Sequence, residues 1–190
     1  MLSAKFIRSK LTMQVSKLVS FEEAKSFTQS LLEEIETGKL SEVETQDGIT
    51  SLVKSENGAR GFFVTYLTGD YELADNPSNA VINALKSAPE TVSELLVKNL
   101  AMSAAMAVTH RRNNDEEMAK GSERVRQRTV NIIKQVKLDS VSQELSQLQQ
   151  SLTTGEGSYQ AFLQRWGYDT EQKQVIELAL SEVKGKISED

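Results

Sequence analysis

The chain contains no cysteine, one histidine and two prolines among its 190 residues. Without cysteine it has no thiolate nucleophile, no disulfide and no thiolate metal site. Because His110 stands alone, a metal motif that needs two histidines is impossible. Carboxylate, lysine, serine and tyrosine chemistry remain available. We expect no catalytic residue, no metal and no cofactor, and the composition favours a protein that is not an enzyme.

Long apolar runs are also missing from the sequence. No run approaches the ~20 residues that cross a membrane as a helix, so we expect no transmembrane segment. The absence of cysteine suits a reducing compartment, and we expect the protein in the cytoplasm. Hydrophobic residues make up 38% and charged residues 26% of the chain, which is typical of a globular protein.

Residues 1–19 contain no acid and form a basic segment in which Lys5, Arg8 and Lys10 alternate with apolar side chains. Such a segment could lie on an anionic membrane surface. A frayed terminus is the alternative, with the natural start at either Met1 or Met13. We treat it as separate from a helical domain of residues 20–190.

Charge is distributed unevenly along the chain, whose net charge is −5. Residues 98–137 carry nine basic and four acidic residues, a net charge of +5, and the rest of the chain carries −10. This basic central segment predicts a surface for an acidic protein partner or a second copy of the chain. Alternatively, these basic residues form an ordinary solvent-exposed helix face, and the acidic segments of the same chain balance their charge. The candidate partner-binding residues are Arg111, Arg112, Arg124 and Arg128.

Nucleic acid is a poor candidate for that partner. The basic residues are not interleaved with aromatic side chains, and no helix-turn-helix pattern of glycines is present. The sequence pI of about 5.1 points the same way.

Helical periodicity dominates the chain and predicts an all-α fold, a single compact bundle of about eight helices. Ser20 with Glu23, and Asp169 with Gln172, form capping boxes that begin two of the helices. Asn76-Pro77 and Pro89 are read as helix starts with proline at the first helical position. The second of these opens the longest helix, which we expect at the centre of the bundle.

One apolar run, Phe62–Leu67, fits either a strand or a buried helix. Because its neighbours all have helical patterns, a lone strand would have no partner for its backbone, and we predict a short buried helix. The preceding Gly58 and Gly61 suggest a tight turn between two helices.

Residues 115–153 are predicted to form a central αα-hairpin, with a heptad-like apolar seam along its second helix. A glycine-rich turn at 153–158 then resembles a linker before the C-terminal pair of helices. At the start of that pair, Tyr159, Phe162, Leu163 and Trp166 have the spacing of one apolar helical face.

A rival hypothesis places a pocket near Gly58–Asp70, for a small anionic ligand or a carboxylate- or tyrosine-based enzyme. Its candidate ligand-binding residues are Arg60 as the anion anchor, with Tyr66, Asp70 and His110 as polar groups. His110 is equally explained as a cation at a helix C-terminus. No phosphate-binding glycine motif is present.

Three stretches carry a resemblance to a known family: GARGFFVTYLTGD at 58–70, LVKNLAM at 96–102 and HRRN at 110–113. They resemble conserved stretches of a cyanobacterial protein family of unassigned function. The resemblance implies a cytoplasmic setting. It identifies no catalytic residue in this chain. Together the patterns favour a non-enzymatic helical interaction or assembly module that presents a basic central face to an acidic protein.

Overall fold

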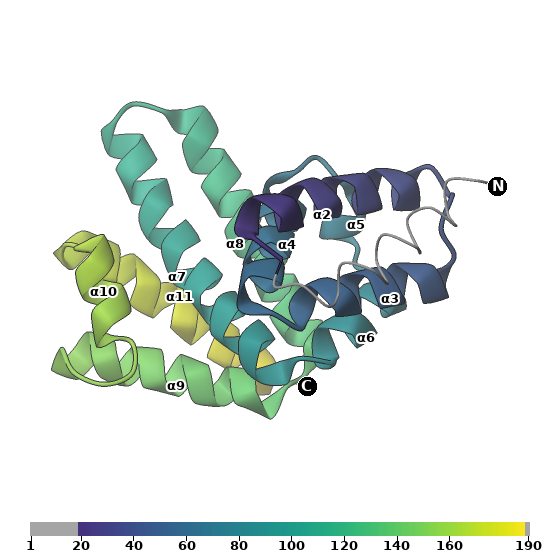
Figure 1. Ribbon diagram of the computed structural model, residues 1–190. Coiled ribbons are helices and arrows are strands. Elements are labelled where there is room, and N and C mark those ends of the chain that lie inside the picture. The colour runs from purple at the N-terminus through teal and green to yellow at the C-terminus, as the bar shows by residue number, and fades with distance from the viewer. Residues whose placement is uncertain (1–18, 189–190) are drawn as a thin grey trace. The chain divides into compact units, whose positions relative to one another are not determined.

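The computed structural model describes residues 19–188, and every regular element in that range is a helix (Figure 1). The all-α prediction is therefore confirmed, with ten helices in the described range. The chain divides between Leu95 and Leu96 into two compact units, which we describe separately. The predicted N-terminal segment lies almost wholly outside the described residues.

The first unit is built from five helices and the beginning of a sixth. These are α2 (Phe21–Glu36), α3 (Glu42–Val53), α4 (Glu56–Thr68), α5 (Glu72–Asp75), α6 (Asn79–Lys86) and the start of α7 (Pro89–Arg112). Within this unit α2 packs on α3 and α4, and α3 packs on α4 and α6. Burial of apolar side chains between these helices supplies the main stabilisation of the unit.

The apolar run that was ambiguous in sequence is helical and forms the middle of α4. The rings of Phe62, Phe63 and Tyr66 are at most 1% exposed. Phe62 stacks on Tyr66 with ring centroids 5.0 Å apart, and it meets Phe63 edge to face at 5.4 Å. Such aromatic pairs add about 0.5–1.5 kcal/mol each beyond area burial. This aromatic cluster is part of the buried core of the first unit.

Gly58 and Gly61 lie inside α4 and not at a turn, so that prediction was wrong. The break between helices falls just before them, where Ser55 caps α4 by accepting from the Gly58 N–H. A Cβ on Gly61 would stand 2.5 Å from the Ala24 Cβ on α2. The glycine is therefore needed for close packing of α2 against α4.

Two of the helix starts that the local sequence predicted are present in the structure, and one is not. The predicted capping box of Ser20 and Glu23 is present at the start of α2, and Pro89 begins α7 as expected. The predicted start at Asn76-Pro77 was wrong, because Asn76 caps the end of α5 and α6 begins at Asn79, directly after Ser78.

The second unit contains the rest of α7, from Leu96 onward, and four more helices. These are α8 (Glu116–Val136), α9 (Asp139–Thr154), α10 (Gln160–Trp166) and α11 (Thr170–Ser188). Lys137, in the left-handed conformation, ends α8 just before α9 begins. α11 packs against both α8 and α9, and α10 packs against α9. The seam residues Val141, Leu145 and Leu148 are buried.

The apolar face predicted for α10 is only partly buried. Tyr159 and Leu163 are 2% and 8% exposed, whereas Trp166 is 45% exposed. Trp166 is the last residue of the helix, and the chain turns away at Gly167 in the left-handed conformation. Helical spacing aligned Trp166 with the buried face, but the short helix ends before a neighbour covers it.

Among the described helices, α7 alone has the length and composition of a membrane span. More than half of its apolar window is buried inside the protein, a condition that the core helix of a soluble protein also meets. Its buried residues include Val92, Leu96, Leu100 and Ala104.

Candidate functional site

The basic segment begins at the C-terminal turn of α7, which holds His110, Arg111 and Arg112. Cations at this end of a helix are stabilised by the helix dipole. The backbone oxygen of His110 accepts hydrogen bonds from the N–H groups of Asn113 and Asp115, at 3.1 and 2.9 Å. These bonds make the tight connection to α8.

Arg111 joins α7 to α8 by two ion pairs. Its guanidinium binds the carboxylate of Glu123 and approaches that of Glu116 at 3.5 Å. The hydrogen bond to Glu123, helped by the charge of that carboxylate, raises the pKa of Arg111. Both acids lie on α8, so the predicted partner-binding side chain already has acidic partners in its own chain.

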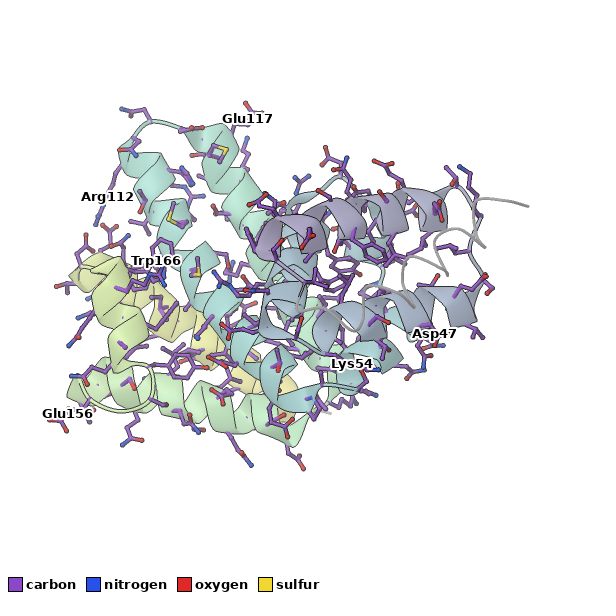
Figure 2. The ribbon with its side chains drawn as sticks, viewed as in Figure 1. Asp47, Lys54, Arg112, Glu117, Glu156 and Trp166 are labelled. Atoms are coloured by element: carbon purple, nitrogen blue, oxygen red, sulfur yellow. The ribbon has the colours of Figure 1, made fainter. Side chains whose placement is uncertain are left out.

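Arg112 joins α7 to α11 (Figure 2 marks it at the end of α7). Its guanidinium donates to Asp169 at 2.5 Å and also binds Glu171. The hydrogen bond from Arg112 lowers the pKa of Asp169, as does the Gln172 N–H that donates to the same carboxylate. Asp169 and Gln172 also complete the predicted capping box of α11.

The other two predicted partner-binding arginines lie on α8 in opposite environments. Arg124 is exposed, whereas Arg128 is only 3% exposed and cannot present its charge to a partner. Between them, Arg126 binds Glu182 of α11 at 2.7 Å.

The outward face of α8 carries a row of polar side chains at spacings of four, three, four and three residues. We call this row the α8 basic stripe, and its members are Lys120, Arg124, Gln127, Asn131 and Lys134. The first three are exposed and the last two are half-buried. The stripe carries three positive charges, and from Arg124 onward no acid occurs before Asp139.

The residues predicted to bind a small anion divide between the two units. In the first unit the Arg60 guanidinium lies over the Phe21 ring at 5.6 Å, and Asp70 is exposed after α4. Tyr66 is fully buried, and its hydroxyl donates to the Leu73 backbone oxygen at 2.5 Å. His110 belongs to the second unit. A shared ligand site for these four residues stays a prediction.

The sequence analysis missed a cleft between α3 and α6 in the first unit. It has a volume of about 620 Å³ and is largely open to solvent. We call it the α3–α6 cleft, and its lining residues are Glu42, Val43, Gln46, Pro77, Ser78, Asn79, Ala80 and Asn83. These residues form no known motif, and only the fold places them together. Within residues 19–188, no group of three or more acidic or histidine side chains could hold a metal ion.

One protein family, described as uncharacterised conserved protein UCP020893, matches residues 20–183. The chain belongs to this family. Membership confirms the resemblance to a conserved family of unassigned function, and the cyanobacterial setting stays a prediction. No curated protein and no solved structure matches the chain. The matched range extends over most of the first compact unit and most of the second.

Proposed function

We propose that this UCP020893 member is a non-enzymatic helical interaction module that presents the α8 basic stripe to an acidic protein partner in the cytoplasm. The observation that carries the proposal is the α8 basic stripe itself, whose residues are exposed or half-buried and whose helix has no acid in its sequence from Arg124 to its end. A surface of one sign attracts a partner of the opposite sign and increases the rate of association.

Three of the four arginines that the sequence analysis predicted to bind a partner are either engaged by acids of the same chain or buried. Arg111 and Arg112 are engaged by four acids of the same chain and tie α7 to α8 and α11. Arg128 is buried. Of the four arginines singled out from sequence, Arg124 is the one that lies on the α8 basic stripe, where it is exposed beside Lys120 and Lys134.

A second copy of the chain belongs to the same class of partner. The described part of the first unit, residues 19–95, has fourteen acidic and five basic residues. It could therefore meet the stripe of another molecule. Sedimentation velocity at low and high salt distinguishes this arrangement, because a charge-driven oligomer dissociates as salt screens it.

The test reverses two charges of the stripe. Partners are isolated with the full chain, identified and purified, and their affinity is then measured for the Lys120→Glu, Arg124→Glu double variant. We expect the affinity to fall at least tenfold, and the wild-type affinity to weaken between 0.1 and 1 M salt as the Debye length shrinks from about 10 to about 3 Å.

The matched control is the Lys39→Glu, Lys173→Glu variant, which makes the same charge change at exposed residues outside the stripe. Its affinity should stay within twofold of wild type. An acidic partner that binds the stripe variant and the wild type equally well would contradict the proposal.

A further inference from the structure

The outward face of α2 carries a row of polar side chains with the same spacing as the α8 basic stripe. Its residues follow one another at intervals of four, three, four and three, so they share one side of the helix. The side of α2 that packs into the first unit, which includes Ala24, Thr28 and Leu31, is opposite. We call the row the α2 acidic stripe, and its members, all exposed, are Glu22, Ser26, Gln29, Glu33 and Glu36.

The three carboxylates of the α2 acidic stripe make contacts that leave them able to bind further cations. Glu22 pairs with Lys25 at 3.2 Å, and Glu33 accepts from the Gln29 amide at 3.1 Å. Glu36 accepts from the Glu72 N–H at 3.0 Å. Each contact uses one carboxylate oxygen, whereas an ionised carboxylate can accept several hydrogen bonds. A cation of another molecule can therefore be added to each.

Negative charge is concentrated at the C-terminal end of α2. The last turn of the helix contains no basic residue, and this end of a helix is also the negative end of its dipole. Burial raises the pKa of Tyr71, and the charges of Glu33 and Glu36 raise it further. The N-terminal half of α8, at the positive end of its own dipole, holds Lys120 and Arg124. These two ends attract each other when the helices run antiparallel.

The charges of the two stripes match in an antiparallel arrangement. The first and last charges of each stripe are 14 positions apart, about 21 Å along a helix. With these aligned, the third charges of the two stripes lie within one position, about 1.5 Å, of each other. The three opposite-charge pairs are Lys134 with Glu22, Arg124 with Glu33, and Lys120 with Glu36.

The other positions and the opposite direction support the same alignment. In the antiparallel arrangement Gln127 faces Gln29 and Asn131 faces Ser26, and these side chains can hydrogen-bond to one another. A parallel arrangement has the same spacing but forms only two charge pairs, because Arg124 then faces Ser26. It also places like ends of the two helix dipoles together.

We propose that the α8 basic stripe of one molecule binds the α2 acidic stripe of a second copy of this chain, with the two helices antiparallel. The inference rests on the proposed function and identifies its acidic partner. Every copy carries both stripes, so the contact either occurs twice in a two-fold dimer or continues from copy to copy. In both cases the mass in solution rises with protein concentration.

The experiment is sedimentation equilibrium of the full chain. We expect the wild type to self-associate in about 0.1 M salt and to dissociate in about 1 M salt, where the Debye length falls from about 10 to about 3 Å. Two variants each make the charges of both stripes alike at one end. They are Lys120→Glu, Arg124→Glu on α8 and Glu33→Lys, Glu36→Lys on α2, and each should raise the self-association Kd at least tenfold.

An equimolar mixture of the two variants separates the contact from folding. In the mixture each reversed stripe meets a reversed stripe of opposite charge, and the unchanged stripes also match. Association should therefore return, with a Kd within about threefold of wild type. A loss of folding in either variant could not be repaired by mixing.

Matched controls reverse the same charges outside both stripes. They are Asp47→Lys, Glu156→Lys and Lys54→Glu, Lys173→Glu, all at exposed residues (Figure 2 labels Asp47, Lys54 and Glu156). Each control should self-associate with a Kd within about twofold of wild type. Equal losses in the controls and the stripe variants would show a general charge effect and overturn the proposal.

Two further results would overturn the self-association. One is a wild-type chain that stays monomeric at low salt, and the other is a mixture of the stripe variants that does not associate. The proposed function would still stand if the Lys120→Glu, Arg124→Glu variant lost the binding of a different acidic protein. It would fail as well only if that binding were also unchanged.

Discussion

Arg124 and Arg128, one helical turn apart on α8, show how strongly the surroundings of a residue determine its role. Arg124 is exposed on the basic stripe, and Arg128 is 3% exposed. A guanidinium is costly to bury without hydrogen-bond partners, so a buried arginine is held in place by its neighbours. Arg124 therefore lies at the protein surface, whereas Arg128 contributes to the interior.

The two helical glycines Gly61 and Gly121 lead to a prediction at this scale. Gly61→Ala would place a Cβ 2.5 Å from the Ala24 Cβ and within 3.0 Å of the α2 backbone. Overpacking of this kind costs about 1–3 kcal/mol and works against the helix-propensity gain of up to about 1 kcal/mol. We expect a lower melting temperature and a lower free energy of unfolding, measured in urea.

Gly121→Ala is the matched control, because nothing lies within 4 Å of the added Cβ on α8. This variant should gain up to about 1 kcal/mol of stability from helix propensity alone. If both variants shifted stability in the same direction, close packing of α2 on α4 would not be the reason for Gly61.

At the scale of elements, α7 is connected to α8 and α11 by charged and polar contacts at its C-terminal end. Arg111 reaches α8, Arg112 reaches α11, and Gln172 of α11 donates to the Thr109 hydroxyl at 2.9 Å. The ion pairs are solvent-exposed, and such pairs contribute modestly to stability. Their main effect is to set which helix ends meet.

The Arg112–Asp169 pair leads to a prediction about pH. Because the pKa of Asp169 is lowered in the folded protein, the pair stabilises the fold above the unfolded value of about 3.9. That contribution is lost as the pH falls through the folded pKa. We expect a carbon-13 NMR titration of the Asp169 carboxyl group to give a higher midpoint in Arg112→Gln than in wild type.

Lys173→Gln is the control for this titration. It removes a nearby exposed positive charge on α11 that does not contribute to the lowered pKa of Asp169. Its midpoint should remain at the wild-type value. A shift as large as that of Arg112→Gln would show that general positive charge, and not the hydrogen bond, lowers the pKa.

At the scale of the whole molecule, two compact units share one helix. The division falls between Leu95 and Leu96, yet α7 is helical from Pro89 to Arg112. Val92, Leu96, Val97 and Leu100 around the division are 0% exposed. Continuous hydrogen bonding and burial are the conditions under which backbone amides exchange slowly.

Hydrogen exchange of α7 tests this continuity. We expect amides from Leu95 to Leu100 to exchange as slowly as those of the α4 core around Phe63, measured by NMR or mass spectrometry. The exposed start of α8, around Glu117, provides the fast reference within the same chain. Fast exchange confined to residues 94–97 would instead reveal a hinge between the two units.

Sequence predicted the features that depend on neighbours along the chain. The capping boxes of Ser20 with Glu23 and Asp169 with Gln172 need only residues three apart, and both formed. The same is true of Pro89, whose fixed φ suits a first helical turn. The helical state of Phe62–Leu67 followed because an isolated strand cannot satisfy its backbone.

Tertiary structure alone decided how those helices use their side chains. Arg112 meets Asp169 across 57 positions of sequence, and Ser78 does not cap the helix that it precedes. Helical spacing likewise assigned Trp166 to a buried face that no neighbour covers. A helix and its caps depend on hydrogen bonds between nearby residues, which the local sequence determines. Pairing, burial and clefts depend on which distant elements come into contact, and those contacts exist only in the folded chain.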